Sequence, residues 1–284
     1  LAVLPGGRAD ESVDAAGAFV LPGLIHGHLH LCQTLFRGLA EQSDLLCWLR
    51  ESVWRLEAAH TEASIAASAR LGLVELIAGG VTCINDMGTV GHTDAIAAVL
   101  EQSGIRAIFG KALMDRGAGV PPGLRENAAQ ALESALSLHR RWNGAADGRL
   151  QVSLAPRFIL SCSDELWREV AAVGAERGLL VHTHLAESPA EAREVHDAVS
   201  TSAARYFAKC GVLSERFVGA HGVWVDDEEL ALLKRADAAL VHCPGSNLKL
   251  GSGFANVKRW VHEGLRRGIG SDGAACDNRL DTFH

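Results

Sequence analysis

The sequence predicts an α/β fold, a (β/α)8 barrel of the TIM type, on the basis of three observations. Eight strand-like segments alternate with helical segments, and this number of alternations over about 250 residues is typical of the barrel. The strand segments are mostly apolar, which indicates that both faces of the sheet are covered. An open doubly wound sheet is the alternative, but no Gly-x-Gly-x-x-Gly motif follows a strand segment.

The first strand segment, residues 19–31, begins as an apolar run and then alternates histidine with glycine or leucine. A two-residue period is typical of a strand, so His26, His28 and His30 are expected on one face. Residues 1–18 before it are rich in Gly, Ala and Asp, and we expect them to be the remnant of an N-terminal β-sandwich. The barrel domain is then expected to cover residues 19–284.

The remaining elements follow in alternation. The other strand segments, which are mostly apolar, are at 81–87, 105–113, 150–155, 179–184, 217–221, 238–243 and 268–272. Apolar residues at helical spacing and capping residues predict helices at 45–56, 61–77, 92–102, 124–142, 164–177, 201–209, 227–235 and 256–266. Ser188-Pro189-Ala190-Glu191 predicts one further helix start, with a capping serine, proline at the first position and glutamate at the third.

Composition and charge exclude several classes of partner. The formal net charge is -7 and the basic residues are scattered, so neither nucleic acid nor an anionic membrane is expected. The sequence contains no apolar run of about 18 residues, and residues 1–5 lack the features of a signal peptide. Seven cysteines without a Cys-x-x-Cys motif indicate reduced thiols in a cytoplasmic enzyme. A small-molecule substrate is expected, and a homo-oligomer is compatible with the sequence.

Polar residues gather where the predicted strands end, and this is the rim of a TIM-type barrel that carries the chemistry. His28 and His30 end the first strand, and two histidines at this spacing lie roughly 7 Å apart along a strand. The later strands contribute the other candidates, which are His182, His184, Glu187, His221, His242 and Asp272. The joint placement of these residues predicts an active site.

Zinc favours three or four nitrogen and oxygen ligands with one open position. His28, His30, His184 and Asp272 are the predicted ligands, and Asp272 is also expected to accept the proton of the attacking water. Spacing alone does not separate His182 from His184, and Glu187 three residues on favours His184. Fe²⁺ is the alternative metal, and the roles of His26 and His242 stay open.

Two further residues are expected to handle protons and the nucleophile. Glu187 is placed to carry protons to a ring nitrogen of the substrate, and His221 to hold or polarise the attacking hydroxide.

Several runs point to one known family. They are Pro22-Gly23-Leu24-Ile25 before His28-x-His30, His184-x-x-Glu187, Ala220-His221-Gly222, His242-Cys243-Pro244-Gly245-Ser246-Asn247-Leu248-Lys249-Leu250 and Gly270-Ser271-Asp272-Gly273-Ala274. Together they resemble the amidohydrolase superfamily, in its one-metal deaminase and chlorohydrolase branch. The resemblance implies the same four metal ligands, with Glu187 and His221 in proton transfer. Relatives also carry a small β-sandwich and a last barrel helix, whereas this sequence stops at His284.

The resemblance implies deamination of an amino-substituted N-heterocycle. Trp54-Arg55-Leu56-Glu57 and the run from Asn247 are similar to deaminases of S-adenosylhomocysteine, 5′-methylthioadenosine and 5′-deoxyadenosine. There the glutamate that matches Glu57 binds the ribose hydroxyls. Lys111 and Gly123 stand where arginines are expected to clasp a homocysteine carboxylate, which favours a carboxylate-free 5′-substituent.

Three alternative functions remain open at this point. Gln33 and Pro156-Arg157-Phe158 resemble guanine deaminase, in which the glutamine and arginine grip the purine edge. An arginine fork suits a carbonyl oxygen and a ring nitrogen in one plane, although Arg157 pairing with a carboxylate at the barrel mouth is the simpler reading. Chlorotriazine hydrolases share the scaffold. A truncated, inactive metal-binding barrel is the third alternative.

Overall fold

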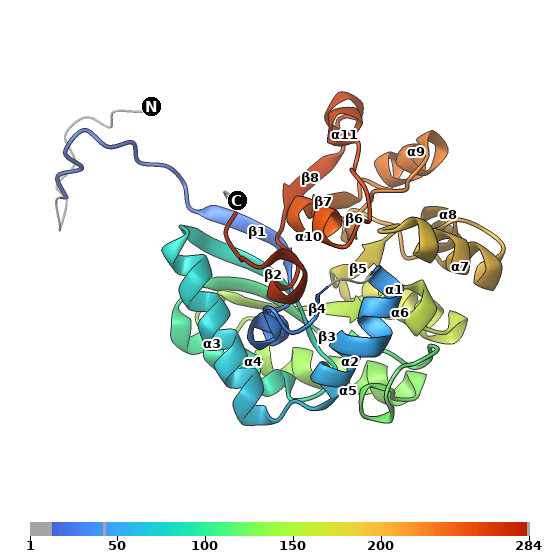
Figure 1. Cartoon of the computed structure of the whole chain (residues 1–284), viewed down its shortest axis with the longest axis horizontal. Helices are drawn as coiled ribbons and strands as arrows, with labels where there is room; N and C mark the ends of the chain where they lie inside the picture. The colour runs from blue at the N-terminus through green and yellow to red at the C-terminus, as the bar shows by residue number, and fades with distance from the viewer. Residues whose placement is uncertain (1–12, 42–43, 283–284) are drawn as a thin grey trace.

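The computed structural model describes residues 13–41 and 44–282, and its eight parallel strands lie in the order β1 to β8 (Figure 1). The strands are β1 Leu24–Leu29, β2 Val81–Thr89, β3 Arg106–Leu113, β4 Leu150–Pro156, β5 Val181–Leu185, β6 Phe217–His221, β7 Ala239–His242 and β8 Arg266–Ile269. A parallel bridge between Leu29 and Asp272 brings the chain after β8 back to β1. The eight strands thus form a nearly closed barrel, which confirms the predicted fold class.

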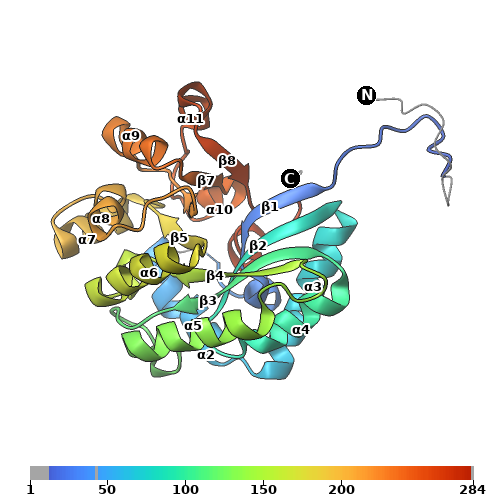
Figure 2. The ribbon, with the colours of Figure 1, turned by 180° about the vertical axis from the view of Figure 1, so that it is seen from behind.

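The helices lie outside the strands, as Figure 2 shows for α3 to α6. Their bounds are α1 Leu45–Trp48, α2 Trp54–Ala58, α3 Glu62–Ala78, α4 Thr93–Ser103, α5 Ala128–Trp142, α6 Asp164–Arg177, α7 Pro189–Val199, α8 Ala203–Cys210, α9 Asp227–Arg235, α10 Pro244–Lys249, α11 Val257–Glu263 and α12 Ala274–Asp277. A π-helical turn at Leu49–Val53 joins α1 to α2, and 3-10 turns occupy Leu31–Phe36, Pro122–Leu124 and Ile159–Ser161. Within the described part of the chain, none of these helices combines the length and hydrophobicity needed to cross a membrane.

Local capping chemistry explains where α7 begins. The Ser188 hydroxyl accepts a hydrogen bond from Glu191 N at 3.2 Å, and Glu191 Oε2 accepts one from Glu187 N at 2.6 Å. Pro189 at the first helical position has no N–H to leave unpaired. The predicted helix start is therefore confirmed, and the cap also holds the backbone of Glu187.

The structure corrects several element boundaries. β1 covers Leu24–Leu29 rather than 19–31, and the helix predicted at 256–266 ends at Glu263. The helix predicted at 124–142 begins at Ala128. Pro121 is extended and Pro122 starts a 3-10 turn that ends at Leu124, so the helix cannot start there. The Asn127 side chain caps the helix that follows. The strand predicted at 268–272 ends at Ile269, so that the residues after it turn toward β1.

An aromatic cluster packs the helices against the strands that carry the later site residues. Trp167 of α6 lies 4.7 Å from Phe207 of α8 between ring centroids, and Phe207 lies 5.4 Å from Phe217 of β6. All three side chains are fully buried. Burial on this scale stabilises the fold by about 1.5–3 kcal/mol for each large apolar side chain, and it anchors β6 within the barrel.

The chain after β8 closes the barrel against β1 through main-chain contacts. Asp272 N donates to His28 O at 3.2 Å, and Ser271 N donates to Nε2 of His26 at 2.8 Å. A Cβ on Gly270 would lie 2.5 Å from His28 O, so only glycine allows this approach. His26, whose role the sequence left open, is thus a buried structural link between the two ends of the barrel.

Residues 13–18, part of the predicted β-sandwich remnant, are exposed and contain no strand. Residues 1–12 lie outside the described residues, and so do residues 283 and 284 of the predicted barrel domain. The proposed division of the chain at residue 18 therefore stays a prediction.

Candidate active site

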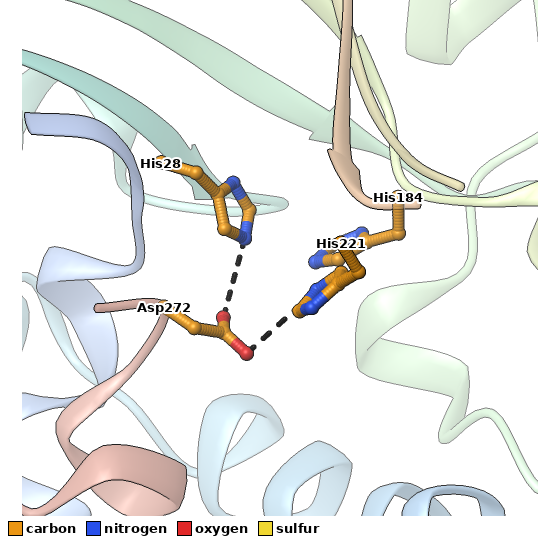
Figure 3. Close-up of side chains that lie close together, drawn as sticks. All are labelled: His28, His184, His221 and Asp272. Atoms are coloured by element: carbon orange, nitrogen blue, oxygen red, sulfur yellow. Dashed lines mark hydrogen bonds and ion pairs between the residues drawn. The ribbon is translucent and has the colours of Figure 1, made fainter. Parts of the chain in front are cut away.

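Buried polar side chains converge at the carboxyl ends of the strands. His28 lies in β1, His184 in β5, His221 at the end of β6 and Asp272 after β8, and Figure 3 shows their side chains turned toward a common centre. One ligand atom from each of these four lies within 4.8 Å of the others. This group contains His221 in place of the predicted ligand His30. His30, directly after β1, contacts the same group, since its Nε2 lies 3.2 Å from His184 Nε2 and 3.3 Å from Asp272 Oδ1.

The spacing of the ligand atoms fits a tetrahedral metal site. Asp272 Oδ1 lies 3.2 Å from His28 Nε2 and 3.3 Å from His30 Nε2. The Nε2 atoms of His30 and His184 lie 3.2 Å apart. Zinc bonds of about 2.0–2.1 Å place neighbouring ligands of a tetrahedron about 3.3 Å apart. These three contacts link the four predicted ligands and have the length expected between neighbouring ligands of one divalent metal ion.

Hydrogen bonds behind two of the imidazoles set which nitrogen faces the centre. His184 Nδ1 lies 2.7 Å from the carbonyl oxygen of Arg157, which only accepts, so Nδ1 carries the proton. His221 Nδ1 donates to Asn247 Oδ1 at 2.9 Å. Both residues then turn an Nε2 lone pair toward the centre, and Nε2 of His221 is buried without a hydrogen-bond partner. For the predicted ligand His184 this is the arrangement common in metal-ligating histidines, whereas Nε2 of His221 faces Glu187 at 3.4 Å and Asp272 at 3.9 Å.

Burial puts the histidines into the form that binds metal. It lowers the pKa of His28 to about 4 and that of His184 well below its usual value, so both rings are neutral near pH 7. Burial alone would raise the pKa of Asp272, but the adjacent imidazoles of His28 and His30 hold that pKa well below its usual value. An ionised carboxylate with neutral imidazoles is the donor set required for zinc.

Glu187 is the proton carrier predicted for the site, and its environment supports a protonated form. Burial raises its pKa well above the usual value, and the charges of Asp272 and Glu191 raise it further. Its Oε2 lies 3.4 Å from Nε2 of His221, which lies 3.9 Å from Asp272 Oδ2. Glu187 and Asp272 therefore flank one imidazole, and their pKa values are shifted in opposite directions.

A cavity opens beside these groups. It is lined by His30, Gln33, Leu45, Trp48, Leu49, Arg157, Phe158, His184, Glu187, Glu191 and Asp272. The predicted substrate residues Gln33 and Arg157 thus face the same cavity as the histidines, together with an apolar wall that the sequence did not single out.

Glu57, the third predicted substrate residue, is occupied by its neighbours. Its carboxylate accepts hydrogen bonds from Arg157 at 2.5 and 3.1 Å and from Gln33 Nε2 at 2.9 Å. Arg157 thus pairs with a carboxylate, as in the alternative to a substrate-binding role. Glu57 orients Gln33 and Arg157, and both of its oxygens are engaged.

The structure places three other residues outside the cavity. Lys111 pairs with Glu126 and lines a separate hollow beside α4 and α5, so it does not stand where it would meet a substrate carboxylate. His182 Nε2 lies 2.8 Å from His28 Nδ1, which puts His182 behind a ligand. His242 packs edge-on against Trp260, a structural position.

The sequence reasoning assigned no site role to two residues of α10. Ser246 Oγ donates to Asp272 Oδ2 at 2.7 Å, and Asn247 accepts from His221. Their only signal was the Pro244-to-Leu250 run, because a six-residue helix has too few turns to show a periodic pattern.

Comparison with known proteins identifies relatives over nearly the whole chain. A 5-methylthioadenosine/S-adenosylhomocysteine deaminase 2 from Archaeoglobus fulgidus is 37% identical over 276 residues, which cover 97% of this chain and 64% of the relative. A 5′-deoxyadenosine deaminase from Methanothermobacter thermautotrophicus is 35% identical over 280 residues, covering 99% and 64%. The chain therefore spans slightly less than two thirds of the length of these relatives.

Solved structures of other proteins have the same fold as this chain. A guanine deaminase from C. acetobutylicum with bound guanine matches with a TM-score of 0.87 and 27% identity, covering 92% of this chain and 63% of the other. An adenosine deaminase from Xanthomonas campestris with bound zinc matches with a TM-score of 0.84 and 28% identity, covering 92% and 58%. The model of the amidohydrolase family matches residues 19–283. The chain belongs to the amidohydrolase family.

Proposed function

We propose that this protein is a metal-dependent deaminase that removes the amino group of an adenine nucleoside as ammonia. The observation that carries the proposal is the set of 3.2–3.3 Å contacts joining His28, His30, His184 and Asp272 beside a buried Glu187. The names of the relatives, which are deaminases of 5′-methylthioadenosine, S-adenosylhomocysteine and 5′-deoxyadenosine, support the same reaction class.

His28, His30, His184 and Asp272 would hold one Zn²⁺, with Fe²⁺ as the alternative. When bound, such an ion lowers the pKa of a water molecule toward about 7 and supplies hydroxide at neutral pH. Three imidazole nitrogens and one carboxylate oxygen suit zinc, and the bound zinc in the adenosine deaminase relative supports this choice.

The chain's own residues would then move the protons. A new C–O bond forms at the amino-bearing ring carbon while Glu187 gives its proton to the adjacent ring nitrogen. Asp272 Oδ2 and His221 Nε2 lie where they can hold the proton that the attacking water loses. When the C–N bond breaks, the proton from water passes to the amino group, which leaves as ammonia. The proton on the ring nitrogen or on the new hydroxyl group returns to Glu187, so that the remaining ring is the neutral hydroxy or oxo form.

The cavity favours an apolar 5′-substituent such as those of 5′-deoxyadenosine and 5′-methylthioadenosine. Leu45, Trp48, Leu49 and Phe158 form its apolar wall. Among the described residues that line it, Arg157 is the one cation, and Glu57 already neutralises it. A homocysteine carboxylate would therefore enter without a free positive partner, which is costly in a buried site.

The test is a substrate screen with the zinc-loaded protein, following ammonia release and the loss of adenine absorbance. The panel contains 5′-deoxyadenosine, 5′-methylthioadenosine, S-adenosylhomocysteine, guanine and a chlorotriazine. We expect the first two to have the highest kcat/KM, about tenfold or more above S-adenosylhomocysteine. Turnover of guanine alone, chloride release alone or no turnover at all would each contradict the proposal, the last favouring an inactive metal-binding barrel.

A further inference from the structure

The short helix α10 contacts two proposed catalytic groups that come from different strands. We propose that Ser246 and Asn247, neighbours on α10, are positioning residues for Asp272 and His221, an inference that rests on the proposed function of those two groups. Consecutive residues of a helix point about 100° apart. In one turn of α10, the Ser246 side chain can therefore contact Asp272 after β8, and the Asn247 side chain can contact His221 at the end of β6.

Ser246 determines how the Asp272 carboxylate is turned. Its hydroxyl is fully buried and lies 2.7 Å from Oδ2. A carboxylate only accepts, so Ser246 donates. With Oδ2 held in this way, Oδ1 faces His28 and His30 at 3.2 and 3.3 Å.

A second donor lies near the same oxygen of Asp272. Cys276 Sγ is 3.2 Å from Oδ2, but it lies 3.1 Å from Gly273 O as well, and a single S–H proton serves one acceptor at a time. A thiol is also a weak donor. Ser246 is therefore the stronger of the two restraints on this carboxylate.

Asn247 determines which nitrogen of His221 carries the proton. Both side chains are buried, and Asn247 Oδ1 lies 2.9 Å from His221 Nδ1. This acceptor holds the proton on Nδ1 and leaves the Nε2 lone pair facing Glu187 at 3.4 Å and Asp272 at 3.9 Å. Without it, the imidazole could adopt the other tautomer, and its proton would then point into the site.

The first experiment measures Zn²⁺ affinity by competition with a chelating dye, without any substrate. Ser246→Ala should weaken Zn²⁺ binding about 10-fold to 100-fold, as loss of a group that orients a ligand does, and Ser246→Thr should restore most of it. Ser246→Cys, which keeps the volume but donates weakly, should lie between them and replaces the alanine variant if that one does not fold. Unchanged affinity in folded Ser246→Ala or Ser246→Cys would overturn the assignment of Ser246.

The second experiment reads the His221 tautomer by nitrogen-15 NMR of the zinc-bound protein, with the signals assigned by comparison with His221→Gln. The wild type and Asn247→Asp should show the proton on Nδ1, whereas Asn247→Leu should show a mixture or the other tautomer. Zn²⁺ affinity should stay unchanged in Asn247→Leu, because His221 is outside the proposed ligand set. A proton on Nε2 in the wild type, or a tautomer unaffected by Asn247→Leu, would refute the role of Asn247.

Leu248→Ala is the matched control on the same helix, because Leu248 is 55% exposed. It should change neither the Zn²⁺ affinity nor the tautomer, and a change in either would show that α10 responds to any substitution. Neither readout uses a substrate. If the wild type binds zinc in a Ser246-dependent way but turns over no nucleoside, the positioning role holds and only the proposed function fails.

Discussion

Glu187 and Asp272 are buried carboxyl groups on either side of His221, yet their surroundings shift their pKa values in opposite directions. Burial and the neighbouring charges of Asp272 and Glu191 raise the pKa of Glu187, whereas the imidazoles of His28 and His30 hold that of Asp272 down against the effect of burial. Two neighbouring groups whose pKa values are shifted in opposite directions are typical of the acid and the base of one reaction. The local environment of each residue thus supports its proposed role.

Glu187→Gln removes the transferable proton and preserves the shape of the side chain. We expect kcat for ammonia release to fall about 10²-fold to 10⁴-fold, the usual contribution of a positioned general acid. Zinc content should stay at one ion per chain, because Glu187 is outside the ligand set. Glu194→Gln, on the exposed side of α7, is the control and should keep wild-type kcat. Full activity in Glu187→Gln would remove the residue from the mechanism.

The ion pair between Glu57 and Arg157 is buried on both sides. Glu57→Gln leaves the guanidinium without its counter-charge, and breaking a buried pair typically costs about 3–5 kcal/mol of unfolding free energy. Urea denaturation measures this loss. Glu51→Gln breaks an exposed pair with Arg55 and should cost at most about 1 kcal/mol. Similar losses in the two variants would show that the Glu57 pair is not specially important for stability.

Among the elements, the join between β8 and β1 connects the fold directly to the site. Leu29 bridges to Asp272, and His26 holds the turn at Ser271. The carboxylate therefore reaches the histidines of β1 only when the main chains approach closely.

Gly270→Ala tests this join, because the new methyl group would meet the main chain of His28. We expect the end of β8 to move away, with a loss of Zn²⁺ affinity of about tenfold or more. Gly91→Ala is the control, since its Cβ would meet no atom within 4 Å. A Gly270→Ala variant that binds zinc as tightly as the wild type would show that Asp272 is held by other contacts.

On the scale of the whole molecule, a bound metal would tie together strands that are distant in sequence. The proposed ligands come from β1, β5 and the chain after β8. A ligand that binds only the folded state stabilises it by about 2.7 kcal/mol at 100 times its Kd. Removal of metal with a chelator should lower Tm, and added Zn²⁺ should restore it. Asp272→Asn should show a much smaller response, and an equal response would place the metal elsewhere.

The stability of the metal-free protein should depend on pH through His26. Burial lowers the pKa of His26 from 6.5 to about 4, so between these pH values the unfolded chain binds more protons than the folded protein. The contribution of His26 to the free energy of unfolding is complete above pH 6.5. It is lost as the pH falls toward 4, which lowers the free energy of unfolding by an amount on the order of 3 kcal/mol. Urea unfolding at both pH values measures it. His28 titrates in the same window, so His26→Gln should reduce the slope and leave part of it. An unchanged slope in His26→Gln would contradict the prediction.

Most of the fold followed from periodicity and capping. All eight strand segments were found, most of them because a buried strand is a largely apolar run with turn residues at its ends. The start of α5 was placed too early because the apolar spacing extends into a segment where Pro121 and Pro122 override it. The end of β8 was misplaced because its four residues are exposed and include two arginines, so no apolar run marks the strand.

The sequence by itself determined the barrel, the family and the candidate residues at the strand ends, since these depend on local pattern and on runs of neighbouring residues. Only the tertiary structure decided that Glu57 binds Arg157 and Gln33, that Lys111 lies outside the cavity, and that Ser246 and Asn247 hold the proposed catalytic groups. Each of these contacts joins residues that are 24 or more positions apart or depends on which face of an element a side chain occupies. Such pairings are set by barrel closure, and no local periodicity records them.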